Sequence, residues 1–290
     1  MVRTLLIRGM LAGLIAGMAG FVFARVVGEP HVDRAIAFEE YIEYNAKNAH
    51  RHGTGAEAAP VSQAAPGSAG RSSAGSTEAP KQSAEAEEEL VSRTVQRSAG
   101  LATGALLYGV ALGGIFGIVF SMAYNRLAPL GVRGTAAVLG LLGFVAVYLT
   151  PFVKYPANPP SIGDPETIGR RTALYLLMFL LSVAGMVLAV VARQRMAPRQ
   201  GGWNATLIAG AGYLVAMVIC GALLPVINEV PQQALAEVAS AVTEGGVTFP
   251  PTLLWGFRVA SLGLQVVVWA TIALVFGGLV HRTLEPATAR

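Results

Sequence analysis

Charge and cysteine are both scarce in this 290-residue chain, and each shortage excludes a class of protein. Charged residues make up 13% of the chain and hydrophobic residues 53%, whereas a soluble domain carries roughly 25% charged residues. The single cysteine, Cys220, lies inside an apolar run, so the sequence offers no disulfide framework and no cysteine-based metal cluster. These proportions predict an integral membrane protein.

Catalytic motifs are missing as well. The sequence contains no nucleotide-binding loop, no metalloprotease helix motif and no nucleophile elbow. The sequence therefore gives no sign of a self-contained ATPase or hydrolase, and the missing catalytic residues also count against an intramembrane enzyme. No basic surface with interleaved aromatic residues indicates a nucleic-acid partner.

Long apolar runs are what the chain has in abundance. Six of them approach or exceed the roughly 20 residues that cross a bilayer core as a helix, at about 9–27, 100–124, 135–153, 172–192, 204–227 and 252–280. We predict an all-α bundle of about six transmembrane helices. The first run could also be a signal peptide, cleaved after Ala24, but its glycine stripe favours a retained helix.

That stripe has a counterpart in the second run. Glycine recurs every four residues at Gly9, Gly13 and Gly17, and again at Gly109, Gly113 and Gly117. Small residues at this spacing let two helix backbones approach closely in lipid. We expect the first and second spans to pack against each other.

The remaining organisation follows from composition. We predict a first span over 1–27, an outer surface helix over 28–49, a disordered linker over 50–83, and five further spans over 84–290 with outer loops at 154–171 and 228–251. Pro30 is expected to end the first helix, and Asp33 to cap the next. The linker is rich in Ala, Gly, Ser and Pro, without periodicity, and cannot bury enough apolar area to offset its ordering entropy.

The Pro-rich loop over 154–171 is the most rigid polar segment of the chain. Its four prolines restrict φ and move the residues before them out of the helical region. We interpret it as a folded cap at one mouth of the bundle; an ordinary stiff loop is the alternative.

Charge sets the expected orientation. The short loops that carry Arg126, Arg133, Arg193, Arg195 and Arg199 have no acid, whereas the loop after the fifth span has Glu229, Glu237 and Glu244 and no base. The positive-inside rule then places both termini in the cytoplasm. The protein is expected in the plasma (inner) membrane, with a net negative outer mouth.

Two groups of residues are candidates for function. Glu29, His31 and Asp33 alternate and would converge in an extended segment, where carboxylate and imidazole ligands suit Co²⁺ or Ni²⁺; charges flanking a helix cap are the alternative. Glu229 is a fourth candidate ligand.

A polar stripe marks the last span. Arg258, Ser261 and Gln265 share one helix face, and a charge in a span is a functional candidate unless it merely snorkels to the interface. Glu229 and Asp164 are its expected acidic partners. The residues assigned to the structure and pathway of the outer mouth are Lys154, Asn158, Asp164, Arg170, Arg258 and Gln265.

Several segments together resemble one family. They are Glu29–Glu40, Lys154–Pro160, Gly163–Pro165, Thr167–Thr172, Leu224–Pro231 and Leu253–Trp269. The chain resembles the CbtA family of predicted cobalt transporter subunits over nearly all of its length except the linker.

The resemblance implies a membrane subunit of a cobalt importer that works with a small partner, CbtB, which has one span and histidines. Co²⁺ would be cargo, and no cofactor is expected to be bound permanently. The lipid bilayer is the other partner, and a homo-oligomer is left open. A membrane scaffold or assembly factor without its own transport path is the alternative function.

Overall fold

Helices are the only regular secondary structure in the described residues. The computed structural model describes residues 2–53, 93–124, 126, 130–159, 167–227 and 250–284. The helical elements in these ranges are α1 (Val2–Phe23), η1 (Ala24–Gly28), α2 (Glu29–Gly53), α3 (Arg93–Ala123), α4 (Gly131–Gly143), η2 (Phe144–Leu149), α5 (Thr150–Lys154), α6 (Ile168–Gln200), α7 (Gly202–Leu223) and α9 (Pro251–Leu284).

Six helices are long and apolar enough to cross a membrane. The six stretches are Val2–Tyr41, Ser98–Ala123, Gly131–Lys154, Ile168–Gln200, Gly202–Leu223 and Pro251–Leu284. Many large apolar side chains on them face outward, including Leu223 at 80% exposure and Trp203 at 75%. Lipid rather than water suits such surfaces. The predicted all-α bundle of about six spans is confirmed.

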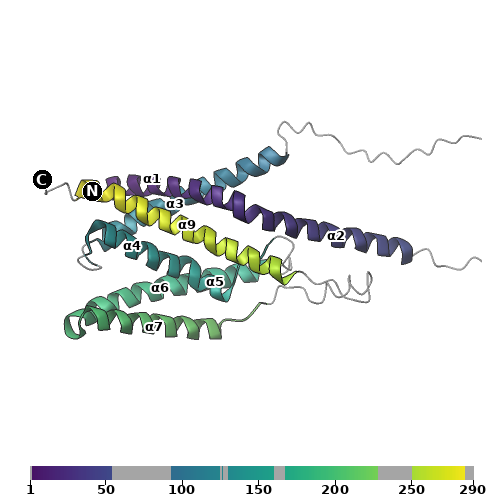
Figure 1. The fold of residues 1–290 in the computed structure, drawn as a ribbon. Coiled ribbons are helices and arrows are strands. Elements are labelled where there is room, and N and C mark those ends of the chain that lie inside the picture. The colour runs from purple at the N-terminus through teal and green to yellow at the C-terminus, as the bar shows by residue number, and fades with distance from the viewer. Residues whose placement is uncertain are drawn as a thin grey trace, which may run out of the picture.

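The spans run alternately up and down, so the two ends of the bundle differ. Figure 1 shows the beginning of α1 and the end of α9 at one end, together with the α3–α4 and α6–α7 connections. We call this the basic end. The opposite end, which we call the loop end, has the end of α5 and the beginnings of α6 and α9, and α2 projects beyond it.

The two glycine stripes meet face to face between α1 and α3. A Cβ atom added at Gly13 would lie 2.0 Å from the Gly109 carbonyl oxygen, and one added at Gly113 would lie 2.2 Å from the Gly9 carbonyl oxygen. Since no real Cβ atom fits at such distances, only glycine allows the backbones this close. The expected packing of the first two spans is confirmed.

The main core joins these two helices to α4 and α9. Phe276 of α9 makes edge-to-face contacts with Phe116 and Phe120 of α3, with ring centroids 5.2 and 4.9 Å apart. Two turns earlier on α9, the Trp269 ring fills the space that a side chain at Gly143 of α4 would need. Aromatic side chains of α9 therefore pack against the rings of α3 and against a glycine of α4.

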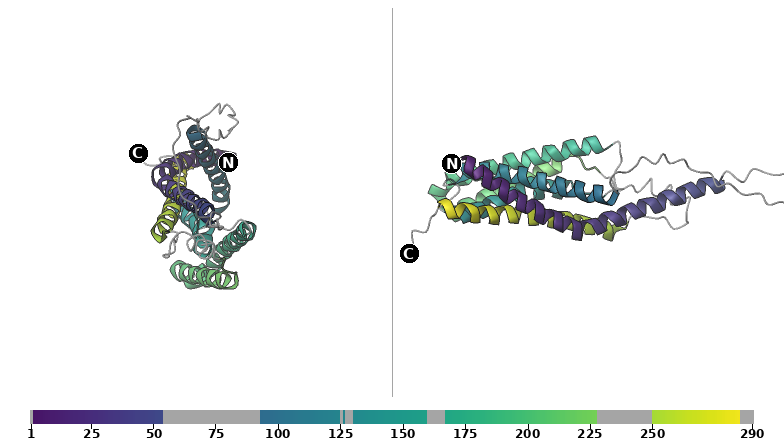
Figure 2. Two further views of the ribbon diagram at one scale, coloured as in Figure 1. Left: turned by 90° about the vertical axis from the view of Figure 1, so that its right-hand side faces the viewer. Right: turned by 90° about the horizontal axis from the view of Figure 1, so that it is seen from above.

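The pair α6–α7 lies to one side of this core, against η2 and α5 (Figure 2). The Tyr213 hydroxyl of α7 links the pair to α5 by a hydrogen bond of 2.8 Å to Thr150, and it forms a second hydrogen bond of 2.8 Å to Ser182 of α6. Hydroxyls inside a membrane need such partners because lipid offers none. The helix α6 ends at Gly201, which has a φ of +80°. The helix α7 ends before Leu224, which is extended because it precedes Pro225.

The structure differs from the sequence-based expectation at Pro30. The first helix does not end there; it continues through the π-helical turn η1 into α2. In η1 the Glu29 N–H bonds to the Ala24 carbonyl, five residues back. This local change of hydrogen-bond register just before Pro30 lets the helix continue past a residue that has no N–H. Most of the predicted linker, and the loop over 228–249, lie outside the described residues.

Candidate functional site at the loop end of the bundle

The loop end is organised by the non-helical stretch that follows α5. Tyr155 is 5% exposed, and its hydroxyl donates to the Pro225 carbonyl at 2.8 Å. Burial raises the pKa of the Tyr155 phenol, and the nearby Arg170 guanidinium offsets part of this increase. The phenol therefore stays protonated and can donate. Pro159, at the end of the described stretch, is fully buried, so this half of the predicted cap is folded.

Two arginines fasten the stretch to the helices beside it. Arg258 of α9 donates from Nη2 to the Asn158 side-chain oxygen at 3.0 Å and from Nε to the Ala157 carbonyl at 3.4 Å. Arg171 of α6 donates from Nη2 to the Pro156 carbonyl at 2.6 Å. Three consecutive residues are thus bound by two guanidinium groups. We call Arg258, Arg171 and residues 156–158 the arginine clamp.

The other residues assigned to the outer mouth occupy different positions. Lys154 places its Nζ 5.8 Å from the centre of the Tyr155 ring, a cation–π distance. Arg170 is exposed at the start of α6. Gln265 lies two turns below Arg258 and accepts a long hydrogen bond of 3.5 Å from the Tyr108 hydroxyl. Asp164 and Glu229 lie outside the described residues, so the acidic partner expected for Arg258 stays a prediction.

The structure does not bring Glu29, His31 and Asp33 together. The segment is helical rather than extended, and residues two apart in a helix point in different directions. Glu29 forms an ion pair with Arg25. The His31 Nδ1 bonds to the Val27 carbonyl at 2.8 Å, and the imidazole ring occupies the space that a side chain at Gly256 of α9 would need.

Acidic residues are confined to one element. Throughout the described residues, every aspartate and glutamate lies on α2, at Glu29, Asp33, Glu39, Glu40 and Glu43. The membrane-spanning parts of α3 to α9 that the structure describes have none. In the same part of the chain, no three His, Cys, Asp or Glu side chains are placed to hold a metal ion together. A cation crossing these spans would meet neutral oxygen atoms instead of carboxylates.

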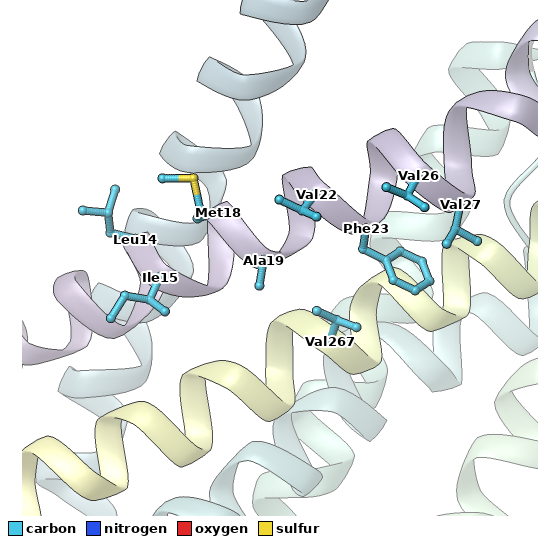
Figure 3. Close-up of a pocket in the computed structure, with 9 residues that line it drawn as sticks. All are labelled: Leu14, Ile15, Met18, Ala19, Val22, Phe23, Val26, Val27 and Val267. Atoms are coloured by element: carbon cyan, nitrogen blue, oxygen red, sulfur yellow. The ribbon is translucent and has the colours of Figure 1, made fainter.

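A groove runs along the outer side of α1 where it crosses α9. Figure 3 shows Phe23 of α1 and Val27 of η1 on the side of Val267 of α9, with Ile15 and Ala19 farther along α1. The groove has a volume of about 730 Å³, and the residues that line it are all apolar. A hydrated cation needs polar partners, so this groove does not suit an ion path. It suits acyl chains or an apolar helix face.

Sequence reasoning missed the second arm of the clamp and the buried tyrosines. The sequence-based prediction names Arg170 and not Arg171, because adjacent basic residues at a helix start give no sign of which one turns inward. Tyr155 and Tyr213 were not singled out either. Their signal was present: a tyrosine in or beside a span needs a hydrogen-bond partner when buried.

Comparison with known proteins assigns the chain to a family. The family described as "probable cobalt transporter subunit (CbtA)" matches residues 2–281. No curated protein and no solved structure matches the chain. The match covers all the described spans together with the clamp and α2. The chain therefore belongs to the CbtA family of probable cobalt transporter subunits.

Proposed function

We propose that this protein is the multi-pass membrane subunit of an importer of divalent metal ions, with Co²⁺ as its cargo. The observation that carries the proposal is the family match over residues 2–281. The six apolar helices support it, because they supply a bundle through which a path can run. A transporter subunit family also favours a role without catalysis.

The charge of the two ends supports an orientation with both termini in the cytoplasm. The basic end carries Arg3, Arg8, Arg126, Arg133, Arg193, Arg195, Arg199 and Arg282, and no acid among its described residues. Short segments rich in Lys and Arg stay on the cytoplasmic side. In the plasma (inner) membrane, α2 and the arginine clamp would then face outward.

In this orientation α2 is the part that meets incoming cations. The helix α2 carries the acidic residues and projects beyond the bundle, and its negative charge raises the local concentration of divalent ions. Glu29, His31, Asp33 and Glu229 are proposed as transient ligands. Since Glu29 is paired with Arg25 and His31 lies against α9, a metal would meet these residues one after another rather than in a single closed site.

A partner subunit fits the sparse ligand set. The family description makes this chain a subunit, and we propose a small CbtB-like membrane protein with one span as the partner that contributes histidine ligands. A homo-oligomer of this chain is a further possible assembly. The bilayer is the remaining partner, and Co²⁺ is cargo, with no cofactor bound permanently.

Uptake of radioactive cobalt tests the proposal. Cells that express the chain with the small partner should accumulate Co²⁺ above cells with an empty vector, and the partner alone should not reach that level. Equal accumulation with and without this chain would contradict the proposal.

A membrane scaffold or assembly factor is the second candidate. The absence of a three-ligand metal group among the described residues favours it. A scaffold would raise the amount of partner in the membrane, and uptake per partner molecule would not change. Quantifying the partner by immunoblot in the same cells therefore separates the two functions.

A further inference from the structure

The shape of the apolar groove between α1 and α9 follows from how the two helices meet. A Cβ atom added at Gly20 of α1 would lie 3.0 Å from a methyl group of Val268. The Phe23 ring fills the space that a side chain at Gly263 of α9 would need. A glycine on each helix thus lets the backbones approach closely. The larger side chains beside this contact, such as Val22 at 54% exposure, form the walls of the groove.

The groove is long and narrow. It is lined from Leu14 to Val27, which is about 20 Å of helix at a rise of about 1.5 Å per residue. With a volume of about 730 Å³, its mean cross-section is about 40 Å², roughly half that of a helix about 10 Å in diameter. A helix would therefore touch only the rim of the groove, whereas the thinner acyl chains of a lipid can lie inside it.

An ion pair lies at the loop end of the groove. Val22, Arg25 and Glu29 follow one another at spacings of three and four residues, which places them on one helix face. Arg25 donates from Nη1 to the Glu29 carboxylate, and the two side chains are 46% and 14% exposed. A guanidinium group has five N–H donors, so Arg25 can bind a second anionic group on its exposed side.

The groove covers one leaflet, and Arg25 lies at the headgroup level of that leaflet. From Arg3 to Arg25 the helix rises about 33 Å, and a hydrocarbon core is about 30 Å thick. If Arg3 lies at the headgroups of the basic end, Arg25 reaches those of the loop end. Leu14, where the groove begins, is midway between them. An acyl chain in the groove would thus have its phosphate beside Arg25.

The charges around Arg25 favour a headgroup without net charge. Glu29 neutralises Arg25, and α2 carries further acids beyond it at Asp33, Glu39 and Glu40. These acids repel a lipid with a net negative headgroup. A zwitterionic headgroup avoids this repulsion, because its phosphate can contact Arg25 while its ammonium group lies toward the acids.

We propose that the groove between α1 and α9 is a binding site for one zwitterionic phospholipid of the leaflet at the loop end. Its acyl chains lie along Ile15, Ala19 and Val22, and its phosphate accepts hydrogen bonds from Arg25. The lipid fills the groove where α1 continues into η1 and α2. This site goes beyond the transport function and does not depend on which ion is carried.

Native mass spectrometry of the full-length chain in detergent tests the site, with phosphatidylethanolamine and phosphatidylglycerol as probes. The wild type should retain one molecule of phosphatidylethanolamine, with an affinity about tenfold higher than for phosphatidylglycerol. Ala19→Phe fills the groove and should lower the affinity for phosphatidylethanolamine about tenfold. Ala216→Phe, the same change at an exposed alanine of α7, is the matched control and should leave the affinity unchanged.

A second variant tests the headgroup contact. Arg25→Gln combined with Glu29→Gln removes the guanidinium group without leaving a carboxylate unpaired, and it should weaken phosphatidylethanolamine binding about tenfold. Unchanged affinity in either variant, or equal binding of the two lipids by the wild type, would overturn the site. If Ala19→Phe does not fold, the double variant decides the outcome by itself.

Photo-crosslinking identifies the occupant in cell membranes. A photoreactive amino acid in place of Val22 should yield a phospholipid adduct that is richer in phosphatidylethanolamine than the adduct formed from Val218, an exposed position on α7. An adduct with a second copy of this chain, or with a helix of another protein, would overturn the lipid site. So would the same lipid composition at both positions.

Discussion

A guanidinium group in a membrane-spanning helix is stable only where its N–H groups find acceptors. Arg258 lies two turns into α9 and meets this requirement with the Asn158 amide oxygen and the Ala157 carbonyl. Both acceptors are neutral, so this contact does not depend on a carboxylate. It binds the beginning of α9 to the end of α5, two elements that are far apart in the sequence.

Replacing Arg258 with Met should therefore loosen the loop end. Hydrogen bonds to a charged group contribute about 2 kcal/mol to stability, and we expect a loss of that size in the free energy of unfolding in detergent. Lys at this position should restore only part of the loss, because an ammonium cannot make the same two contacts from one planar group. Arg199→Met, at the exposed end of α6, should have little effect.

A double-mutant cycle identifies the partner. The effects of Arg258→Met and Asn158→Ala should be less than additive, because each change removes the same hydrogen bond. Additive effects would mean that another group, such as Asp164 or Glu229, carries the contact. In that case removing Arg258 and the acid together should recover part of the stability.

At the scale of elements, the contact between α1 and α3 depends on the absence of side chains. Six glycines, three on each helix, let the backbones touch where any Cβ atom would overlap a carbonyl group. Dispersion between closely packed backbones is what joins helices in lipid, where burial of apolar area gives no driving force. The interface is therefore unusually sensitive to the smallest possible substitution.

Gly113→Ala should separate α1 from α3, whereas Gly104→Ala, on the same glycine-rich helix α3, should not. Ala favours a helix over Gly by about 1 kcal/mol, so both changes strengthen α3 itself. At Gly104 no atom lies within 4 Å of the added Cβ, but at Gly113 the Gly9 oxygen lies at 2.2 Å. We expect a lower melting temperature in detergent for Gly113→Ala only. Equal melting temperatures would show that the α1–α3 contact does not require glycine.

Features that repeat along the chain were the ones that sequence could predict. Apolar runs of membrane length placed the spans, and two stripes with the same four-residue period placed α1 against α3. These signals depend on length and spacing alone. The stripe of Arg258 and Gln265 also pointed to the loop end, although it could not show that Asn158 would be the acceptor.

Features that depend on a close balance between two local backbone conformations could not be predicted from the sequence. Pro30 is a helix breaker in most settings, yet the π-helical turn before it accommodates the missing N–H and the helix continues. Once the segment is helical, Glu29 faces Arg25 one turn away and the proposed convergence with His31 is lost.

At the scale of the whole molecule, the uneven distribution of charge predicts the orientation. The basic end has arginines at its two connections and near both ends of the described chain, and the loop end has the acidic helix α2. A cysteine at Ser73 should react with an impermeant thiol reagent in intact cells, and a cysteine at Gln200 should react only after permeabilisation. Cys220→Ser removes the native thiol as background. Labelling of the cysteine at position 200 in intact cells would contradict the predicted orientation.

The segment between α2 and α3 gives the last prediction. Residues 54–83 are rich in Ala, Gly, Ser and Pro and have no apolar periodicity, so their removal should cost no packing energy. Deleting them leaves residues 84–92 to join Gly53 to Arg93, a stretch that reaches about 30 Å when extended. Expression, melting temperature and Co²⁺ uptake should all stay near wild-type values.

A Gly/Ser segment of the same length in place of residues 54–83 shows whether an effect of the deletion comes from the shorter link or from lost side-chain contacts. If the deletion lowers the yield of folded protein but a Gly/Ser segment in place of residues 54–83 does not, the shortened link is under tension and the prediction about packing holds. Loop-closure entropy changes slowly with length, so the two variants should otherwise behave alike. If both lose folded protein, side chains within residues 54–83 contact the bundle, and the segment is part of the fold rather than a tether.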